Sequence, residues 1–159
     1  MELNLLIFVV LSFVGYISFI INRYGVLPSI SESYYKMKND NLFGGGLFTL
    51  FIWSLSFPLI IVGNTSLMFF AGAFLAFVGA ATAFKDLKMT RRVHNIGAIG
   101  GIGFGFLSMI IDFKLFELTY FMIVISLSLF LLKTKNLIWW VEILAFVLII
   151  IGLFKVVVL

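Results

Sequence analysis

The stretch that decides the fold runs from Arg91 to Asp112 and reads R-R-V-H-N-I-G-A-I-G-G-I-G-F-G-F-L-S-M-I-I-D. It contains His94, the single histidine of the chain. Gly97, Gly101 and Gly105 recur every four residues and therefore share one face of a helix. Glycine weakens a helix in water, but in lipid a glycine stripe lets a neighbouring helix come close, which is a main source of helix–helix attraction there. The stretch predicts the central helix of a membrane bundle.

The composition indicates that lipid is the solvent for most of the chain. Of the 159 residues, 63% are hydrophobic and 11% are charged, whereas soluble domains carry about 25% charged residues. A soluble fold of this size leaves roughly a third of its unfolded surface exposed, so it could not hide this much apolar area. The absence of cysteine excludes disulfides and thiolate chemistry. Because the basic residues lie in short segments between apolar runs, we do not expect a nucleic acid as a partner.

Six apolar runs are each about 17 to 22 residues long, which suits a hydrocarbon core of about 30 Å. We therefore predict an all-α fold, a polytopic integral membrane bundle of six transmembrane helices forming a single transmembrane domain over residues 1–159. The predicted spans are about 3–22, 44–63, 66–84, 93–111, 116–132 and 137–158. The first run has no basic residue before it, so we expect a retained helix rather than a cleaved signal peptide.

Two further patterns concern the connections and the packing of these spans. The polar segment 23–43 contains Ser31 and Ser33 around an acidic residue, which predicts a short interfacial helix beginning there. Gly72, Ala76 and Ala80 form a stripe of small residues on the third span. This stripe matches the glycine stripe of the fourth span, so we expect the two spans to pack closely as a hairpin.

The basic residues predict the orientation of the bundle. Nine of the 11 lie in the connections after the first, third and fifth spans, namely Arg23, Lys36, Lys38, Lys85, Lys88, Arg91, Arg92, Lys133 and Lys135. Lys114 and Lys155 belong to the opposite side. Positively charged connections stay in the cytoplasm. We therefore expect a multi-pass protein of a cell membrane, the inner membrane of a bacterium, with both termini outside.

The same alternation of connections brings the polar residues to one face of the membrane. We expect a pocket there, formed by Ser29, Ser31, Tyr34, Tyr35, Asn41, Arg91, Arg92, His94 and Glu142. Glu142 stands out because an ionisable group inside a span is costly and normally has a partner. His94 or a basic side chain is the expected partner. Both residues also have a plainer interpretation: Glu142 as a structural pair, and His94 as a cap of its helix.

Four short segments carry a resemblance to known proteins: S-I-S-E-S-Y-Y at 29–35, N-L-F-G-G at 41–45, V-H at 93–94, and Glu142 early in the last span. They resemble a group of small bacterial multi-span membrane proteins of unknown function. Those proteins have S-I-S-x-Y-Y after the first helix, a D-V-F-V-G-like start to the second and a V-H start to a later one. This chain differs at Asn41, where the group usually has Asp, and has one extra residue between S-I-S and Tyr-Tyr. The resemblance implies a fold and a polar cluster, not an activity.

More distantly, the layout resembles the DRAM-type proteins and the CREST group of membrane hydrolases. Three functional hypotheses follow. The first is a pocket that binds a lipid headgroup or a small polar ligand without a cofactor or metal, since one histidine and scattered carboxylates are a poor ligand set. The second is a membrane hydrolase using Ser29 or Ser31 with His94 and an acid, or a metal-dependent one like the CREST enzymes. The third is a structural subunit of a membrane complex, packing on a partner subunit or on further copies of the chain through its glycine stripes.

Overall fold

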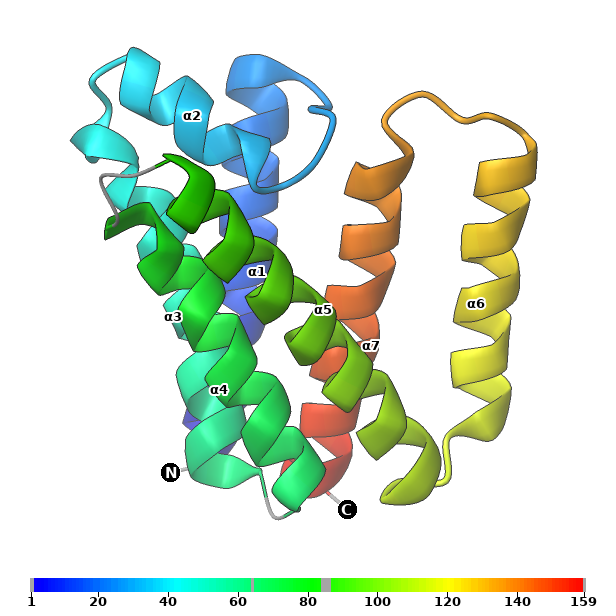
Figure 1. Cartoon of the computed structure of the whole chain (residues 1–159). Helices are drawn as coiled ribbons and strands as arrows, with labels where there is room; N and C mark the ends of the chain where they lie inside the picture. The colour runs from blue at the N-terminus through cyan, green and yellow to red at the C-terminus, as the bar shows by residue number, and fades with distance from the viewer. Residues whose placement is uncertain (1, 64, 84–86, 159) are drawn as a thin grey trace.

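The computed structural model describes residues 2–63, 65–83 and 87–158, which fold into seven α-helices and contain no strand (Figure 1). The helices are α1 (Glu2–Tyr24), α2 (Glu32–Asn39), α3 (Gly46–Val62), α4 (Ser66–Ala80), α5 (Leu87–Ile111), α6 (Phe116–Leu131) and α7 (Leu137–Val158). Short 3-10 turns at Phe43–Gly45 and Ala81–Ala83 extend α3 at its start and α4 at its end. Each predicted apolar run forms one helix, and α2 is the predicted short helix, so the all-α prediction is confirmed.

Among the helices of residues 2–63, 65–83 and 87–158, three are long and apolar enough to cross a membrane. They are α1 with 23 residues, α7 with 22, and the 24 residues Lys88–Ile111 of α5. The other apolar helices, α3, α4 and α6, have 17, 15 and 16 residues. At 1.5 Å per residue these helices measure about 22 to 26 Å, less than a hydrocarbon core of about 30 Å. Length and composition therefore identify α1, α5 and α7 as candidate membrane spans.

The start of α5 differs from the prediction. The helix begins at Leu87, whereas the predicted span begins at Val93. The predicted boundary follows the apolar run, but the helix continues through 88–92 because lysine, methionine and arginine are good helix formers and no glycine or proline interrupts them. Residues 85 and 86 of the predicted connection, and residue 84 of the third span, lie outside the described residues.

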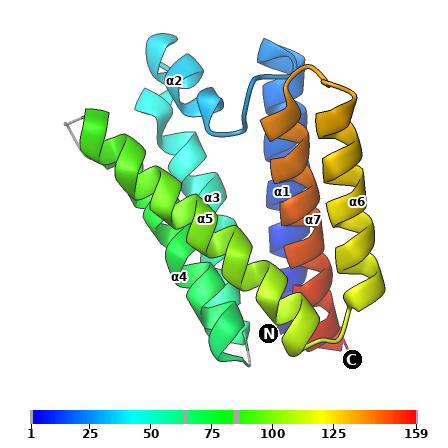
Figure 2. The ribbon, with the colours of Figure 1, turned by 45° about the vertical axis from the view of Figure 1, so that its right-hand side comes forward.

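The helices form two groups (Figure 2). In that view α3, α4 and α5 lie together, and α1, α6 and α7 lie together beside them. The groups approach each other at the end where the chain begins and finishes, and they separate at the other end, which carries α2. Three rings join them in the core: Phe13 of α1, Phe51 of α3 and Phe146 of α7, with centroids 6.0 to 6.4 Å apart. We call the end that carries α2 the α2 end.

Glycines set the close approach of α4 and α5. A Cβ on Gly97 would lie 2.8 Å from the carbonyl oxygen of Phe74, and a Cβ on Gly101 would lie 2.8 Å from the side chain of Leu75. The backbone contact at Gly97 leaves room for glycine alone, whereas a Cβ at Gly101 would require the Leu75 side chain to shift. The prediction that these two helices pack closely is therefore confirmed. The middle helix of this group is α4, which packs on both α3 and α5, so the prediction that the Arg91–Asp112 stretch carries the central helix is not borne out for this group.

The small-residue stripe of α4 serves a different neighbour from the one predicted. A Cβ on Gly72 would lie 2.8 Å from the carbonyl oxygen of Ser56 in α3, so this glycine faces α3 rather than α5. A stripe at four-residue spacing shows that one face is narrow but not which helix covers it. Gly72 of α4, and Gly97 and Gly101 of α5, thus form contacts between helices of the bundle.

The end of the bundle opposite α2 is closed by contacts between α5 and α7. A Cβ on Gly105 would lie 3.1 Å from the side chain of Ile149, so the two helices nearly touch there. Beyond the end of α5, the ammonium group of Lys155 donates a hydrogen bond of 2.7 Å to the carbonyl oxygen of Phe113. α5 and α7 are therefore joined at this end, and any space between them must open toward the α2 end.

Candidate functional site

A cavity of about 890 Å³ lies at the α2 end, between α5 and α7 and beneath α2. Its polar lining residues are Ser29, Ser31, Glu32, Tyr34, Tyr35, Thr82, Thr90, Arg91, His94, Asn95 and Glu142. Its apolar lining residues are Phe48, Val78, Ala81, Ala98, Ile99, Ile102, Gly103, Ile138 and Val141. The cavity therefore combines polar side chains near α2 with an apolar strip of α5 below His94, whereas on α7 the apolar residues Ile138 and Val141 lie nearer the α2 end than Glu142.

Most of the predicted pocket residues share this cavity. Those that line it are Ser29, Ser31, Tyr34, Tyr35, Arg91, His94 and Glu142. His94 comes from α5 and Glu142 from α7, so two residues far apart in the sequence lie on one cavity at one end of the bundle. The alternation of connections predicts this placement, because α2 and the starts of α5 and α7 lie at the same end (Figure 1).

Two predicted pocket residues lie elsewhere. Arg92 faces a neighbouring pocket of about 310 Å³, which it shares with Lys88, Arg91 and Asn95. Asn41 is exposed after the end of α2 and has a φ of 55°. Asparagine tolerates this left-handed conformation better than most residues, so Asn41 serves the turn into α3 and does not line the cavity.

The predicted set also leaves out Glu32, Asn95 and the apolar strip of α5. The sequence contains a pattern that indicates some of these missed residues. His94, Ala98 and Ile102 are spaced four residues apart, and Asn95 lies beside them, so all of them share one side of α5. A search for the polar and apolar residues on the helix face of His94 would have found this wall. Glu32 belongs to the polar segment 23–43, which the alternation of connections places at this end of the bundle.

Three hydrogen bonds hold residues 26–30 against the start of α7. They run from Asn136 Nδ2 to the Val26 carbonyl (2.8 Å), from the Trp139 N–H to the Pro28 carbonyl (3.2 Å), and from the Ile30 N–H to Glu142 Oε2 (2.5 Å). Val26, Pro28 and Ile30 thus bond to Asn136, Trp139 and Glu142, which lie three residues apart just before α7 and in its first turns. We call this arrangement the 26–30 clamp. It fixes the segment that leads into α2 on the side of the cavity formed by α7.

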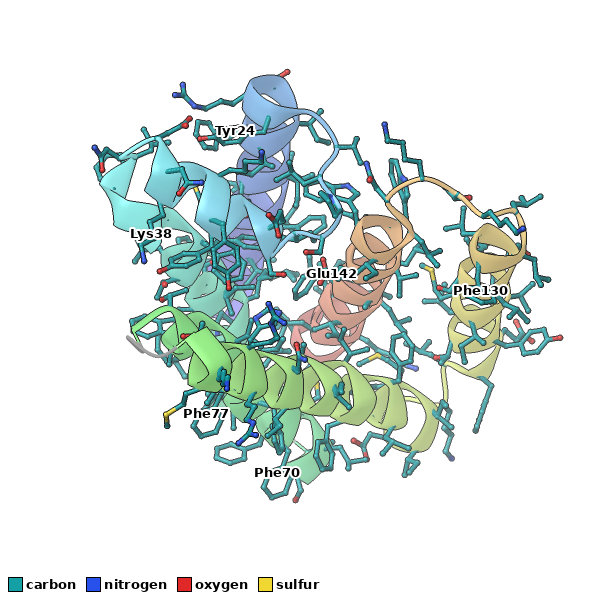
Figure 3. All side chains as sticks on the ribbon, turned by 45° about the horizontal axis from the view of Figure 1, so that its top comes forward. Tyr24, Lys38, Phe70, Phe77, Phe130 and Glu142 are labelled. Atoms are coloured by element: carbon teal, nitrogen blue, oxygen red, sulfur yellow. The ribbon has the colours of Figure 1, made fainter. Side chains whose placement is uncertain are left out.

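The clamp gives Glu142 a different partner from the one predicted. The carboxylate accepts the N–H of Ile30, rather than pairing with His94 or a basic side chain. Figure 3 shows Glu142 pointing from α7 toward the segment that precedes α2. Ile30 is 1% exposed, so no water can replace this acceptor. The plainer interpretation of Glu142, a structural pair, therefore accounts for one of its two oxygens.

A second chain of hydrogen bonds reaches Ile30 from α1. Ser33 is fully buried, and its hydroxyl donates to the Ile30 carbonyl at 2.5 Å. The Tyr16 hydroxyl lies 2.6 Å from the same serine oxygen and must donate to it, because the serine proton is already used. The Tyr16 ring stacks on Phe51 of α3 with centroids 4.0 Å apart. Ile30 is therefore the point at which α1, α2 and α7 are tied together.

The two longest segments of the resemblance contact each other through Tyr34 and Gly45. Gly45 has a φ of 84°, and a Cβ there would lie 2.5 Å from the Tyr34 ring. Both the backbone conformation and the ring therefore require glycine. The Tyr34 hydroxyl donates to the carbonyl oxygen of Thr82 at 3.3 Å. These contacts fix α2 over the cavity and hold the ring of Tyr34 in its wall.

His94 has no hydrogen-bond partner among residues 2–63, 65–83 and 87–158, and its ring borders the cavity. The hydroxyls of Ser29 and Ser31 are 3.0 Å apart, and Ser29 also accepts the N–H of Glu32 at 3.2 Å. In the described part of the chain neither serine is bonded to His94, so the nucleophile–base pair of the hydrolase hypothesis is not formed. Nor do the described residues include three His, Asp or Glu side chains grouped closely enough to share a metal ion.

Comparison with protein-family models, with curated proteins and with solved structures finds no match to this chain. The function must therefore be argued from the cavity and its lining.

The clamp makes a prediction about stability. Glu142→Leu removes the acceptor of the buried Ile30 N–H, and we expect it to lower the free energy of unfolding by about 1 to 3 kcal/mol. Glu142→Gln keeps a side-chain oxygen at this position and serves as the matched control, so it should lose much less. Thermal unfolding of the purified protein in detergent measures both. Equal stability of the two variants would show that the hydrogen bond to Ile30 does not hold the segment.

Proposed function

We propose that the protein is a multi-pass membrane protein that binds one membrane lipid, with the headgroup in the polar part of the cavity and the start of an acyl chain along its apolar part. The observation that carries the proposal is a single cavity in which polar side chains near α2 are followed, along α5, by an apolar strip below His94. Its volume of about 890 Å³ lies within the range of ligand sites, roughly 300 to 1,000 Å³.

The α5 wall supports a ligand that bears an acyl chain. It runs from Thr90 to Gly103, about 20 Å along the helix axis, and its apolar part, residues 98–103, covers about 8 Å of this length. Below His94 the α5 lining residues are Ala98, Ile99, Ile102 and Gly103. A small polar ligand would leave this strip uncovered, whereas a lipid would fill both parts.

The margins of the cavity support entry from the bilayer. Ile99 of α5 is 75% exposed and Ile138 of α7 is 59% exposed, and both line the cavity. Apolar side chains at an opening are suited to contact with lipid chains rather than with water. A lipid could therefore enter between α5 and α7 without leaving the membrane.

The proposal includes six membrane spans. With their 3-10 turns, α3 and α4 become helical runs covering 43–62 and 66–83, close to the length a membrane requires. The connections at the α2 end carry nearly all of the basic residues, whereas Lys114 and Lys155 belong to the opposite end. The α2 end then faces the cytoplasm, both termini lie outside, and the resemblance to small bacterial proteins favours the inner membrane of a bacterium.

Filling the cavity should displace the lipid. Gly103 lines the cavity and a Cβ there meets no atom within 4 Å, so Gly103→Leu places a side chain in the empty space without a clash at its first atom. We expect lipid affinity to fall roughly 5- to 150-fold, since overlap of this kind costs about 1 to 3 kcal/mol. Native mass spectrometry of the detergent-purified protein measures the retained lipid.

Gly15 provides the matched control for this experiment. It is an exposed glycine of α1 that does not line the cavity, and a Cβ added there would likewise meet no atom within 4 Å. Gly15→Leu should retain lipid like the wild type. If Gly103→Leu binds as much lipid as Gly15→Leu, the cavity is not the binding site and the proposed function fails.

The orientation is testable because the chain has no cysteine. Lys36→Cys places one thiol on an exposed position of α2, and Glu117→Cys places one at the exposed start of α6, at the opposite end. In intact spheroplasts a membrane-impermeant maleimide should label Glu117→Cys. It should label Lys36→Cys only after the spheroplasts are lysed. Labelling of both in intact spheroplasts would contradict the six-span arrangement.

A further inference from the structure

We infer that the cavity selects a dipolar headgroup, a phosphate diester that carries an ammonium group a few bonds away. This inference rests on the proposed function and names the ligand class of the same site. It comes from the signs and positions of the charged side chains around the cavity, which the division into polar and apolar parts does not use.

Opposite charges line different walls of the polar part. Arg91 lies on α5, whereas Glu32 lies on α2 and Glu142 on α7. None of these three side chains forms an ion pair with another residue in the ranges 2–63, 65–83 and 87–158. The charges thus face a common space without neutralising one another, which is the arrangement that complements a ligand with two charges.

A headgroup of one sign alone would fit less well. An anionic headgroup would meet the carboxylates of Glu32 and Glu142. A cationic headgroup would meet Arg91 and the neighbouring basic pocket of Lys88 and Arg92. Like charges at such contacts are costly, so the mixed lining disfavours both.

The α5 wall is suited to the phosphate. Arg91 and Asn95 are four residues apart and therefore lie on one side of the helix, with His94 beside them. A guanidinium group, an amide and an imidazole all donate hydrogen bonds, and those from a guanidinium to phosphate are among the strong ones. His94 has its hydrogen-bonding capacity unused by other described residues, which leaves it available to the ligand.

The opposite walls are suited to the ammonium group. Glu142 uses Oε2 for the Ile30 N–H, and its Oε1 accepts no hydrogen bond from the described residues. The Glu32 side chain has no hydrogen-bond or ion-pair partner in that same part of the chain. Tyr35 is 39% exposed and also lines the cavity, and an ammonium group is attracted to an aromatic face.

The test compares lipids that share acyl chains and differ in headgroup. The delipidated protein is titrated with phosphatidylethanolamine, phosphatidylcholine, phosphatidylglycerol and diacylglycerol, and binding is followed by native mass spectrometry. We expect the two ammonium-bearing lipids to bind at least about tenfold more tightly than the other two, since the positive charge of both is attracted to the carboxylates of Glu32 and Glu142 and to the face of Tyr35. Equal binding of all four lipids, or tighter binding of phosphatidylglycerol, would overturn the inference but not the proposed function.

Two substitutions separate the charges, and neither residue has a structural hydrogen bond through its side chain among the described residues. Glu32→Gln should reduce binding of the ammonium-bearing lipids and leave phosphatidylglycerol unchanged or tighter. Arg91→Gln should weaken all three phospholipids to a similar degree. Arg92→Gln is the matched control, because Arg92 does not line the cavity, and it should bind like the wild type. Loss of binding with Arg92→Gln equal to that with Arg91→Gln would contradict the assigned phosphate position.

A soluble headgroup distinguishes the source of the ligand. Glycerophosphoethanolamine carries the phosphate and the ammonium group without acyl chains, and it should bind more than about tenfold more weakly than the intact lipid, because burial of each chain CH₂ contributes about 0.8 kcal/mol. Binding as tight as that of the lipid would overturn the proposed lipid function while supporting the headgroup chemistry. If no lipid binds more tightly to the wild type than to Gly103→Leu, both the proposed lipid function and the headgroup inference are overturned.

Discussion

The hydrogen bond from the Ile30 N–H to Glu142 is the interaction on which the α2 end depends. It closes a gap of 112 positions in the chain and lies at the centre of the 26–30 clamp. The carbonyl group of the same residue accepts Ser33, which in turn is tied to Tyr16. Both backbone polar groups of a fully buried residue are thereby satisfied. Removing the clamp would release the segment that leads into α2, and α2 would no longer be held over the cavity.

The cavity exists because α5 and α7 meet at one end alone. Gly105 against Ile149, and the Lys155 hydrogen bond to the end of α5, join them at the end opposite α2. Toward the α2 end α5 instead follows α4, which it approaches through Gly97 and Gly101. The two helices therefore diverge (Figure 2). On the α5 wall of the space between them, Arg91, His94 and Asn95 lie near α2 and the apolar residues 98–103 lie deeper in the bundle. Loss of either glycine contact would change the angle of α5 and the width of the cavity.

The sequence predicts the helices and the end at which the polar residues gather, because apolar run length and the alternation of connections are properties of the chain itself. It predicts that His94 and Glu142 line one space. It does not predict that Glu142 bonds to a backbone N–H, since no pattern marks which buried N–H lacks a partner until the segment 26–30 is seen to lie on α7. For a related reason, the sequence does not predict which helix packs on the stripe that contains Gly72. Small residues show that one face of α4 is narrow, but the packing of three helices decides which neighbour covers that face. Asn41 is predicted in the pocket because it belongs to a motif, but its positive φ places it in the turn that follows α2.

The central claim, a lipid chain held between α5 and α7, is tested most directly by mapping a bound lipid that carries a photoreactive group in its acyl chain. After irradiation and proteolysis, mass spectrometry should find the label on residues 98–103 of α5, and an excess of unlabelled lipid should remove it. Label spread over the outward faces of the bundle, including the exposed side of α6, and unaffected by competing lipid would contradict the account.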